Sequence, residues 1–307
     1  MECAGVPWME AVRREKGAPV KTIKFGRERR GMKVALCQMA IEFEKKEENT
    51  RRVISFMEQA GSAGADLVLF PEMSLTGFSM NIGLTGEKDR ESVRRLSAEA
   101  KRIGIAAGFG WTALVDGGNG DVSDGVFGEN HYTVISAQGE VLSDYVKMHP
   151  FSYSGEDQYF AKGDQTVHFE LSGIPFSGFI CYDLRFPEIF QAVSDRAHVI
   201  IVAADWPGSR REHWQCLLRA RAIENQCYIL GVNSVGDQNG LHYTGDSSVI
   251  LPDGTVAAQL TDEEGMILYD LTDDVEEYRR SFPMKQDRRP KLYAALQGGG
   301  IVWLNCI

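Results

Sequence analysis

The chain has 307 residues, of which 43% are hydrophobic and 25% charged, a composition that suits one large globular α/β domain. Its formal net charge is −10 and its lysines and arginines are scattered, which argues against nucleic acid or an anionic membrane as a partner and favours small molecules. Six cysteines occur without CxxC pairs and no apolar run reaches the roughly 18 residues of a membrane span, so we expect a cytoplasmic protein without a disulfide framework or a zinc ribbon.

Residues 1–31 differ from the rest of the chain. They are rich in lysine and arginine but have few periodically spaced apolar residues. We expect them to form a poorly ordered N-terminal extension rather than a basic arm that binds nucleic acid or serves as an address. Met32 opens the first clear strand and the domain that we predict for residues 32–286.

Strands and helices alternate from that point. Hydrophobic periodicity predicts helices near residues 46–63, 87–103, 186–195 and 210–226. It predicts strands near residues 32–39, 66–70, 104–110, 130–136, 140–146, 165–170, 174–181, 198–203, 228–234, 245–251 and 264–270. Turns join some strands directly, as at 137–139 and 252–254, which indicates mixed sheets covered by helices. The last segment has no strong period, and we expect residues 287–307 to form an extended tail that packs on the body or on a partner subunit.

Three apolar runs each end at one reactive side chain. Glu72 follows the strand near 66–70, Lys147 follows the strand near 140–146, and Cys181 ends the apolar run before a predicted helix. Ligands bind at the carboxyl edge of open α/β sheets, where these three side chains would lie. The pattern therefore predicts one site that contains a thiol, an ammonium and a carboxylate.

These three groups have complementary chemistry for amide hydrolysis. Cys181 could attack the carbonyl, while the Lys147 ammonium and the backbone N–H of Tyr182 hold the oxyanion. Glu72 could accept the thiol proton, pass it to the departing ammonia and then activate water against the thioester. This scheme needs no metal or organic cofactor.

Other interpretations of the same residues remain open at this stage. Cys181 could be a small buried hydrophobe, and Glu72 and Lys147 ordinary solvated charges. A Cys-His mechanism could use His149 or His213, although no cysteine-protease signature surrounds Cys181. No two histidines have the H-x-x-x-H spacing of a helical zinc site, so we expect no metal.

The segments 69–72, 147–150 and 181–188 resemble the Glu, Lys and Cys motifs of the nitrilase superfamily of carbon–nitrogen hydrolases. The likeness runs from about Met32 to Gln286. It implies an α/β fold, a four-layer α-β-β-α sandwich of two mixed sheets flanked by helices, which forms homodimers or higher homo-oligomers. It also implies a cytoplasmic, cofactor-free amidase-type activity on a small-molecule amide, with Glu156 as a second glutamate that positions nucleophile and substrate.

Within the superfamily, the sequence looks most like the omega-amidase group, which removes the terminal amide of 2-oxoglutaramate or 2-oxosuccinamate. In that group the arginine at the position of Arg185 binds the distal carboxylate of the substrate. The alternative for Arg185 is a salt bridge to Glu188 or Asp183. By the same resemblance, the pocket is expected to be lined by Trp206, Ser209 and Phe78.

Two other functions use the same residues or the same fold. An N-carbamoyl amine or N-carbamoyl amino acid hydrolase would employ the same Glu-Lys-Cys set. A non-catalytic binding subunit would keep the fold, but the presence of every required chemical group argues against it.

Overall fold

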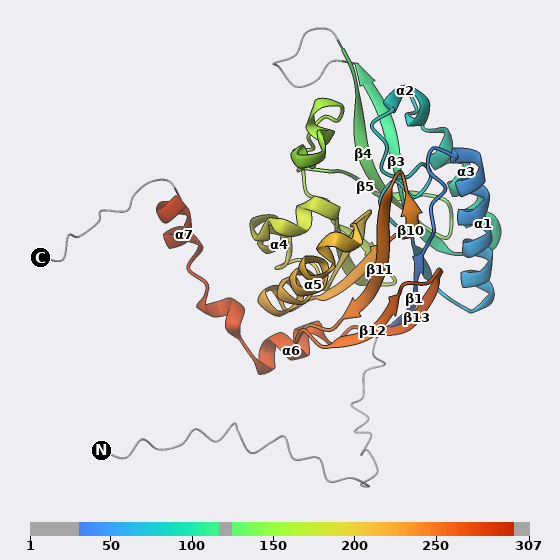
Figure 1. Cartoon of the computed structure of the whole chain (residues 1–307). Coiled ribbons are helices and arrows are strands. Elements are labelled where there is room, and N and C mark those ends of the chain that lie inside the picture. Colours follow the sequence, from blue (N-terminus) through green and yellow to red (C-terminus); the bar gives the residue numbers. More distant parts are fainter. Residues whose placement is uncertain (1–30, 117–124, 298–307) are drawn as a thin grey trace, which may run out of the picture.

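The computed structural model describes residues 31–116 and 125–297 of the chain (Figure 1). The predicted N-terminal extension therefore lies outside the described residues, except for Gly31. In the described ranges, no helix is long and apolar enough to cross a membrane.

The first sheet has six strands in the order β13-β1-β2-β3-β4-β5. β1, β2 and β3 are parallel, whereas β13, β4 and β5 join them in antiparallel pairs. The strands are β1 (Gly31–Gln38), β2 (Leu67–Leu69), β3 (Ala106–Asp116), β4 (Val126–Ile135), β5 (Val141–Val146) and β13 (Gly265–Thr272). The helices beside this sheet are α1 (Lys46–Ser62), α2 (Ile82–Thr85) and α3 (Glu91–Ile103).

The second sheet has seven strands in the order β10-β11-β9-β8-β7-β6, with β12 paired to β11. β7, β8 and β9 are parallel, and every residue of β8 is buried, as expected for a strand covered on both faces. The strands are β6 (Phe169–Leu171), β7 (Ile174–Ile180), β8 (Val199–Ala204), β9 (Tyr228–Asn233), β10 (Val235–Gln238), β11 (Leu241–Ile250) and β12 (Val256–Thr261). The helices on this side are α4 (Pro187–Val193) and α5 (Arg211–Asn225).

The two sheets pack face to face between two helical layers. Figure 1 shows α1 and α3 on one side of the molecule and α4 and α5 on the other. One core cluster joins the sheets, with Leu69 from β2 and Phe179 from β7. A second cluster joins the first sheet to its helices, with Phe109 from β3 packed with Met57 and Leu96. The predicted α-β-β-α sandwich is confirmed.

One predicted helix starts later than expected, the strand predicted near 165–170 is confined to β6 (Phe169–Leu171), and two strands were not predicted. The helix predicted near 87–103 begins only at Glu91, because the backbone of Glu87 bonds to Thr112 and Leu114 of β3. The Glu87 carboxylate then accepts the backbone N–H of Ser92 at 2.9 Å in the first turn of α3. β10 and β12 were not predicted, because β10 is short and β12 is an edge strand without a buried face.

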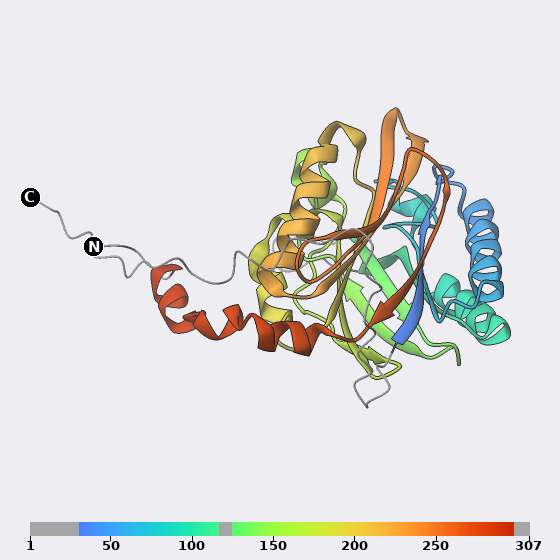
Figure 2. The same ribbon diagram turned by 90° about the horizontal axis from the view of Figure 1, so that it is seen from below.

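After β13 the chain forms α6 (Val275–Ser281) and a 3₁₀ turn (Met284–Asp287) at the end of the predicted domain. The described part of the tail predicted for residues 287–307 contains the helix α7 (Pro290–Gln297) instead of being extended throughout, and residues 298–307 lie outside the described residues. Arg288 still contacts the body through Gln191 Oε1 at 2.7 Å, but residues 289–296 are exposed and Figure 2 shows α7 lying away from the body. Packing on a partner subunit therefore remains the prediction for α7.

Candidate active site

Cys181 lies at a sharp elbow between β7 and the 3₁₀ helix η4 (Cys181–Arg185). Its φ is 45°, in the left-handed region that costs a non-glycine residue about 1–2 kcal/mol. The residue is only 8% exposed, and its Sγ lies 4.0 Å from the carbonyl oxygen of Asp205 at the end of β8. The surrounding fold therefore keeps Cys181 in a backbone conformation that is unfavourable for a residue other than glycine.

The buried carboxylate of Asp183 anchors this elbow to the end of β5. It accepts the backbone N–H of Ile180 at 3.1 Å and the hydroxyl of Tyr145 at 2.8 Å. It also accepts the backbone N–H of His149 at 3.0 Å, and the His149 ring nitrogen Nδ1 lies 2.7 Å from the same oxygen. Asp183 thereby fixes the position of Cys181 relative to the segment that follows Lys147.

The structure brings Glu72, Lys147 and Glu156 into one buried ionic cluster. Lys147 Nζ lies 2.7 Å from Glu72 Oε1 and 2.9 Å from Glu156 Oε2. Asn130 on β4 donates to Oε1 of Glu72 at 2.8 Å and to Oε1 of Glu156 at 3.2 Å. The backbone N–H of Asp205 donates to Glu72 Oε2 at 2.9 Å. Both glutamates are therefore fixed by several donors although neither reaches solvent.

The cluster keeps the ammonium charged and the resting thiol protonated. Burial opposes the charge of Lys147, but Glu156 and Glu72 outweigh that effect and raise its pKa well above the ordinary value. Burial, followed by the negative charge of Glu72, raises the pKa of Cys181 well above its ordinary range, against the opposing effect of Lys147. Proton transfer from the thiol must therefore accompany attack on a substrate.

Tyr182 follows Cys181 in the first turn of η4, where backbone N–H groups have no partner within the helix. Its ring packs 4.8 Å from that of Phe151, between ring centroids, and 5.3 Å from that of Phe186. The position agrees with the predicted oxyanion role of its N–H, which stays a prediction.

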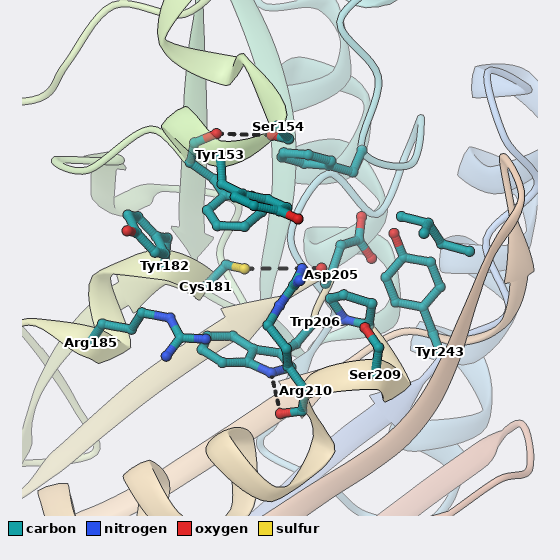
Figure 3. Close-up of a pocket in the computed structure, with 14 residues that line it drawn as sticks. Tyr153, Ser154, Cys181, Tyr182, Arg185, Asp205, Trp206, Ser209, Arg210 and Tyr243 are labelled. Atoms are coloured by element: carbon teal, nitrogen blue, oxygen red, sulfur yellow. Dashed lines mark hydrogen bonds between the residues drawn. The ribbon is translucent and has the colours of Figure 1, made fainter.

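Cys181 lines a pocket of about 310 Å³ (Figure 3). The lining also includes all four predicted substrate-binding residues, which are Phe78, Arg185, Trp206 and Ser209. Trp206 is buried and donates its indole N–H to the carbonyl of Arg210 at 2.9 Å. The Phe78 ring centroid lies 5.4 Å from Lys147 Nζ, whereas Ser209 is exposed at the margin.

Arg185 lies in this pocket and has no carboxylate partner among the residues that the structure describes. Its guanidinium carbon lies 4.7 Å from the ring centroid of Trp206 and 5.9 Å from that of Tyr182, and it donates to His213 Nδ1 at 3.2 Å. Neither ion pair considered from the sequence forms within the described residues. The guanidinium is thus available to a ligand.

The histidine and metal alternatives have no support in the site geometry. His149 bonds to Asp183 and stacks on Phe186, with ring centroids 3.8 Å apart, while His213 bonds to Arg185. Neither histidine has a hydrogen bond to Cys181 in the part of the chain that the structure describes. Residues 31–116 and 125–297 contain no cluster of three potential metal ligands.

Sequence reasoning missed three contributors to the site. Asn130 belongs to a strand whose polar residues resemble those of any half-exposed strand. Asp205 acts through its backbone, to which its residue type gives no clue, and burial followed by the charge of Glu72 raises the pKa of its carboxyl group well above the ordinary value. Arg210 stands at the start of the helix predicted near 210–226, which gave no sign of a functional role, yet its side chain lines the pocket.

Several known proteins are similar to this chain over most of its length. The model of the carbon–nitrogen hydrolase family matches residues 33–280. A 2-oxoglutaramate amidase of Bacillus subtilis (strain 168) is 33% identical over 264 residues, which cover 85% of this chain and 98% of that protein. The omega-amidase YafV of Escherichia coli (strain K12) is 33% identical over 265 residues, with 84% and 96% covered.

A solved structure with the same fold is that of an amidase from Nesterenkonia sp. AN1. One of its variants carries the acetamide moiety of fluoroacetamide, covalently added at the active-site cysteine. That chain is 26% identical, with a TM-score of 0.72, and the match covers 86% of this chain and 95% of the other.

Proposed function

This chain belongs to the carbon–nitrogen hydrolase family, and from that premise we propose that Cys181 attacks the terminal amide of a small carboxylate-bearing substrate. The chain is a hydrolase of carbon–nitrogen bonds other than peptide bonds, of amidase type. The proposed substrates are 2-oxoglutaramate and 2-oxosuccinamate, which yield a 2-oxo acid and ammonia, in keeping with the names of the amidase relatives.

The observation that carries this proposal is the buried set of Glu72, Lys147 and Glu156, whose charges act on the Cys181 thiol. Cys181 in turn lines a pocket that Arg185 also lines. Ionised carboxylates and an ammonium are costly to bury, and such clusters are concentrated at sites of chemistry. Arg185 supplies a planar donor fork that matches the far carboxylate of the substrate.

In the proposed mechanism, Glu72 removes the thiol proton as Cys181 forms a bond to the amide carbon. The Lys147 ammonium and the Tyr182 N–H stabilise the oxyanion of the tetrahedral intermediate. Glu72 then protonates the nitrogen, the carbon–nitrogen bond breaks, and ammonia leaves a thioester on Cys181. Water, deprotonated by Glu72, attacks the thioester carbon, the carbon–sulfur bond breaks and releases the 2-oxo acid, and the proton on Glu72 returns to the Cys181 thiolate. Glu156 keeps Lys147 charged and in place.

Three further properties complete the proposal. The protein acts in the cytoplasm, where a free thiol stays reduced. It assembles as a homodimer or a higher homo-oligomer, which the exposed α7 supports. Its partners are small amides rather than nucleic acid or membrane, consistent with a net charge of −10.

The test is ammonia release from both 2-oxo acid amides, from neutral amides, from nitriles and from N-carbamoyl compounds. Turnover of the 2-oxo acid amides should exceed that of the other substrates and vanish in a Cys181→Ala variant. Cys216→Ala, which changes an exposed cysteine outside the pocket, is the matched control and should retain activity. Faster release of ammonia and carbon dioxide from a carbamoyl compound would favour a carbamoyl hydrolase. Undiminished turnover by Cys181→Ala would sink the mechanism.

A further inference from the structure

A second guanidinium, that of Arg210, lines the same pocket as Arg185. Arg210 ends the 3₁₀ helix η5 (Gly208–Arg210), whereas Arg185 comes from η4, and Figure 3 shows both side chains within the pocket that contains Cys181. The Arg210 side chain forms no hydrogen bond or ion pair within residues 31–116 and 125–297. The pocket thus holds two guanidinium groups without a carboxylate partner.

Arg210 is held by aromatic rings rather than by charge. Its guanidinium carbon lies 5.2 Å from the ring centroid of Phe151 and 5.9 Å from that of Tyr153, which is 84% exposed. The backbone N–H of Phe151 donates to the Glu156 carboxylate, so these rings belong to the loop that holds the buried ionic cluster. Cation–π contacts position the Arg210 guanidinium but leave its five N–H donors free.

The charge of Arg210 acts on Arg185. Burial lowers the pKa of Arg185, Tyr182 opposes this, and the positive charge of Arg210 lowers it further. Among the residues that the structure describes, Asp205 is the only one that brings a carboxyl group to the pocket lining, and burial followed by the charge of Glu72 raises the pKa of that group well above its ordinary value. Within the described residues, neither Arg185 nor Arg210 forms an ion pair with that carboxyl group or any other, so both guanidinium groups are open to an anionic ligand.

We propose that Arg210 is a specificity-determining residue that acts with Arg185, and that the pair selects amides whose far end is a carboxylate next to a carbonyl group. One arginine saturates one carboxylate through two parallel hydrogen bonds, which leaves the donors of the second guanidinium unused. A 2-oxo carboxylate offers a third acceptor oxygen in the same plane, so both guanidinium groups find partners. This inference rests on the proposed function and adds to it that Arg210 is the residue that recognises the 2-oxo group.

The test compares 2-oxosuccinamate, succinamate and propanamide as substrates of the wild type, Arg210→Gln and Arg210→Lys. The Arg210→Gln variant removes the positive charge, whereas Arg210→Lys keeps the charge but lacks the planar guanidinium with its two parallel donors. We expect Arg210→Gln to lower kcat/KM for 2-oxosuccinamate about 10- to 100-fold relative to propanamide, mainly through KM. The loss for succinamate should be smaller, and Arg210→Lys should fall between wild type and Gln. Arg219→Gln, which removes a guanidinium bonded to Gly254 O outside the pocket, should leave the substrate ratios unchanged.

A binding measurement separates recognition from catalysis. In the Cys181→Ala background, adding Arg210→Gln should weaken the affinity for the product 2-oxoglutarate by about tenfold or more in calorimetry. Equal losses of kcat/KM for all three substrates, or an unchanged affinity for 2-oxoglutarate, would overturn the role of Arg210 while leaving the amidase proposal intact. A wild-type enzyme that prefers propanamide would overturn both.

Discussion

Glu72 is the residue on which the chemistry of the site depends, because it is bound by Lys147, Asn130 and Asp205 at once. After burial, the negative charge of Glu72 is the next cause of the raised pKa of Cys181. The same carboxylate therefore keeps the resting thiol protonated and stands ready to receive its proton. Because Glu72 disfavours the Cys181 thiolate until a substrate is attacked, the thiol is protected from side reactions in the free enzyme.

A Glu72→Gln variant separates these two effects. We expect kcat for amide hydrolysis to fall about 10²- to 10⁴-fold, because the general base is lost. We also expect the pKa of Cys181 to fall, because a negative charge beside the thiol is removed while Lys147 remains. The measurement is the pH profile of alkylation by iodoacetamide, followed at Cys181 by peptide mapping. An alkylation profile that moves to higher pH, or an unchanged kcat, would contradict this role.

At this scale, the sequence could predict Glu72, Lys147 and Cys181 because each follows a strand and ends an apolar run. It could not predict Asn130 or Arg210, because their importance depends on groups contributed by other elements. Asn130 matters because it donates to both Glu72 and Glu156. Arg210 matters because its guanidinium lies against Phe151 and Tyr153 in the pocket lining.

Among the elements, the β3–β4–β5 region carries a pH-dependent contact of its own. His131 on β4 stacks on Trp111 of β3, with ring centroids 4.7 Å apart. Its ring nitrogens lie 3.0 Å from Asp144 Oδ1 and 3.1 Å from Glu129 Oε2. Burial opposes protonation, but the two carboxylates outweigh it and raise the pKa of His131 above the ordinary value of 6.5.

A raised pKa in the folded state means that protonation of His131 stabilises the fold. This stabilisation is complete below the unfolded value of 6.5 and is lost as the pH rises through the higher folded value. We therefore expect His131→Gln to reduce the free energy of unfolding by about 1–3 kcal/mol at pH 6 and by less at pH 9, measured by urea denaturation. His242→Gln, at an exposed pair with Asp237, is the control. If His131→Gln lowered the free energy of unfolding more at pH 9 than at pH 6, the stabilising effect of His131 protonation would be contradicted.

Most elements could be predicted from hydrophobic periodicity, because their buried faces repeat at two or 3.6 residues. Two of the failures, at β12 and at α7, share a physical cause, namely the lack of a buried stripe. β12 is a half-exposed edge strand, and α7 is a short helix whose side chains are exposed from Lys291 to Leu296. Neither buries a face in this chain, so neither leaves a periodic pattern.

At the scale of the whole molecule, the site exists only where the two sheets meet. Glu72 follows β2 and Lys147 follows β5 of the first sheet, whereas Cys181 follows β7 and Asp205 follows β8 of the second. The hydrogen bond from Asp205 N to Glu72 Oε2, at 2.9 Å, joins the two halves. The sequence could predict both sheets, but only their packing brings base and nucleophile together.

The exposed C-terminal helix supports the proposed homo-oligomer. Leu292 and Leu296 stand one helical turn apart on α7, with Tyr293 beside them, and all three are exposed. We expect a Leu292→Asp/Leu296→Asp variant to shift the protein toward the monomer in sedimentation velocity, while the body stays folded. Lys291→Gln is the matched control on the same helix. A wild-type protein that sediments as a monomer would refute the oligomer.

The most direct test of the account is to look for the acyl-enzyme itself. The wild-type protein is mixed with 2-oxoglutaramate, quenched in acid during turnover and analysed by intact-mass and peptide mass spectrometry. We predict a mass increase equal to the substrate less ammonia, located on the peptide that contains Cys181 and absent from Cys181→Ala. Release of ammonia at the wild-type rate by Cys181→Ala, with no adduct on the wild type, would contradict the central claim.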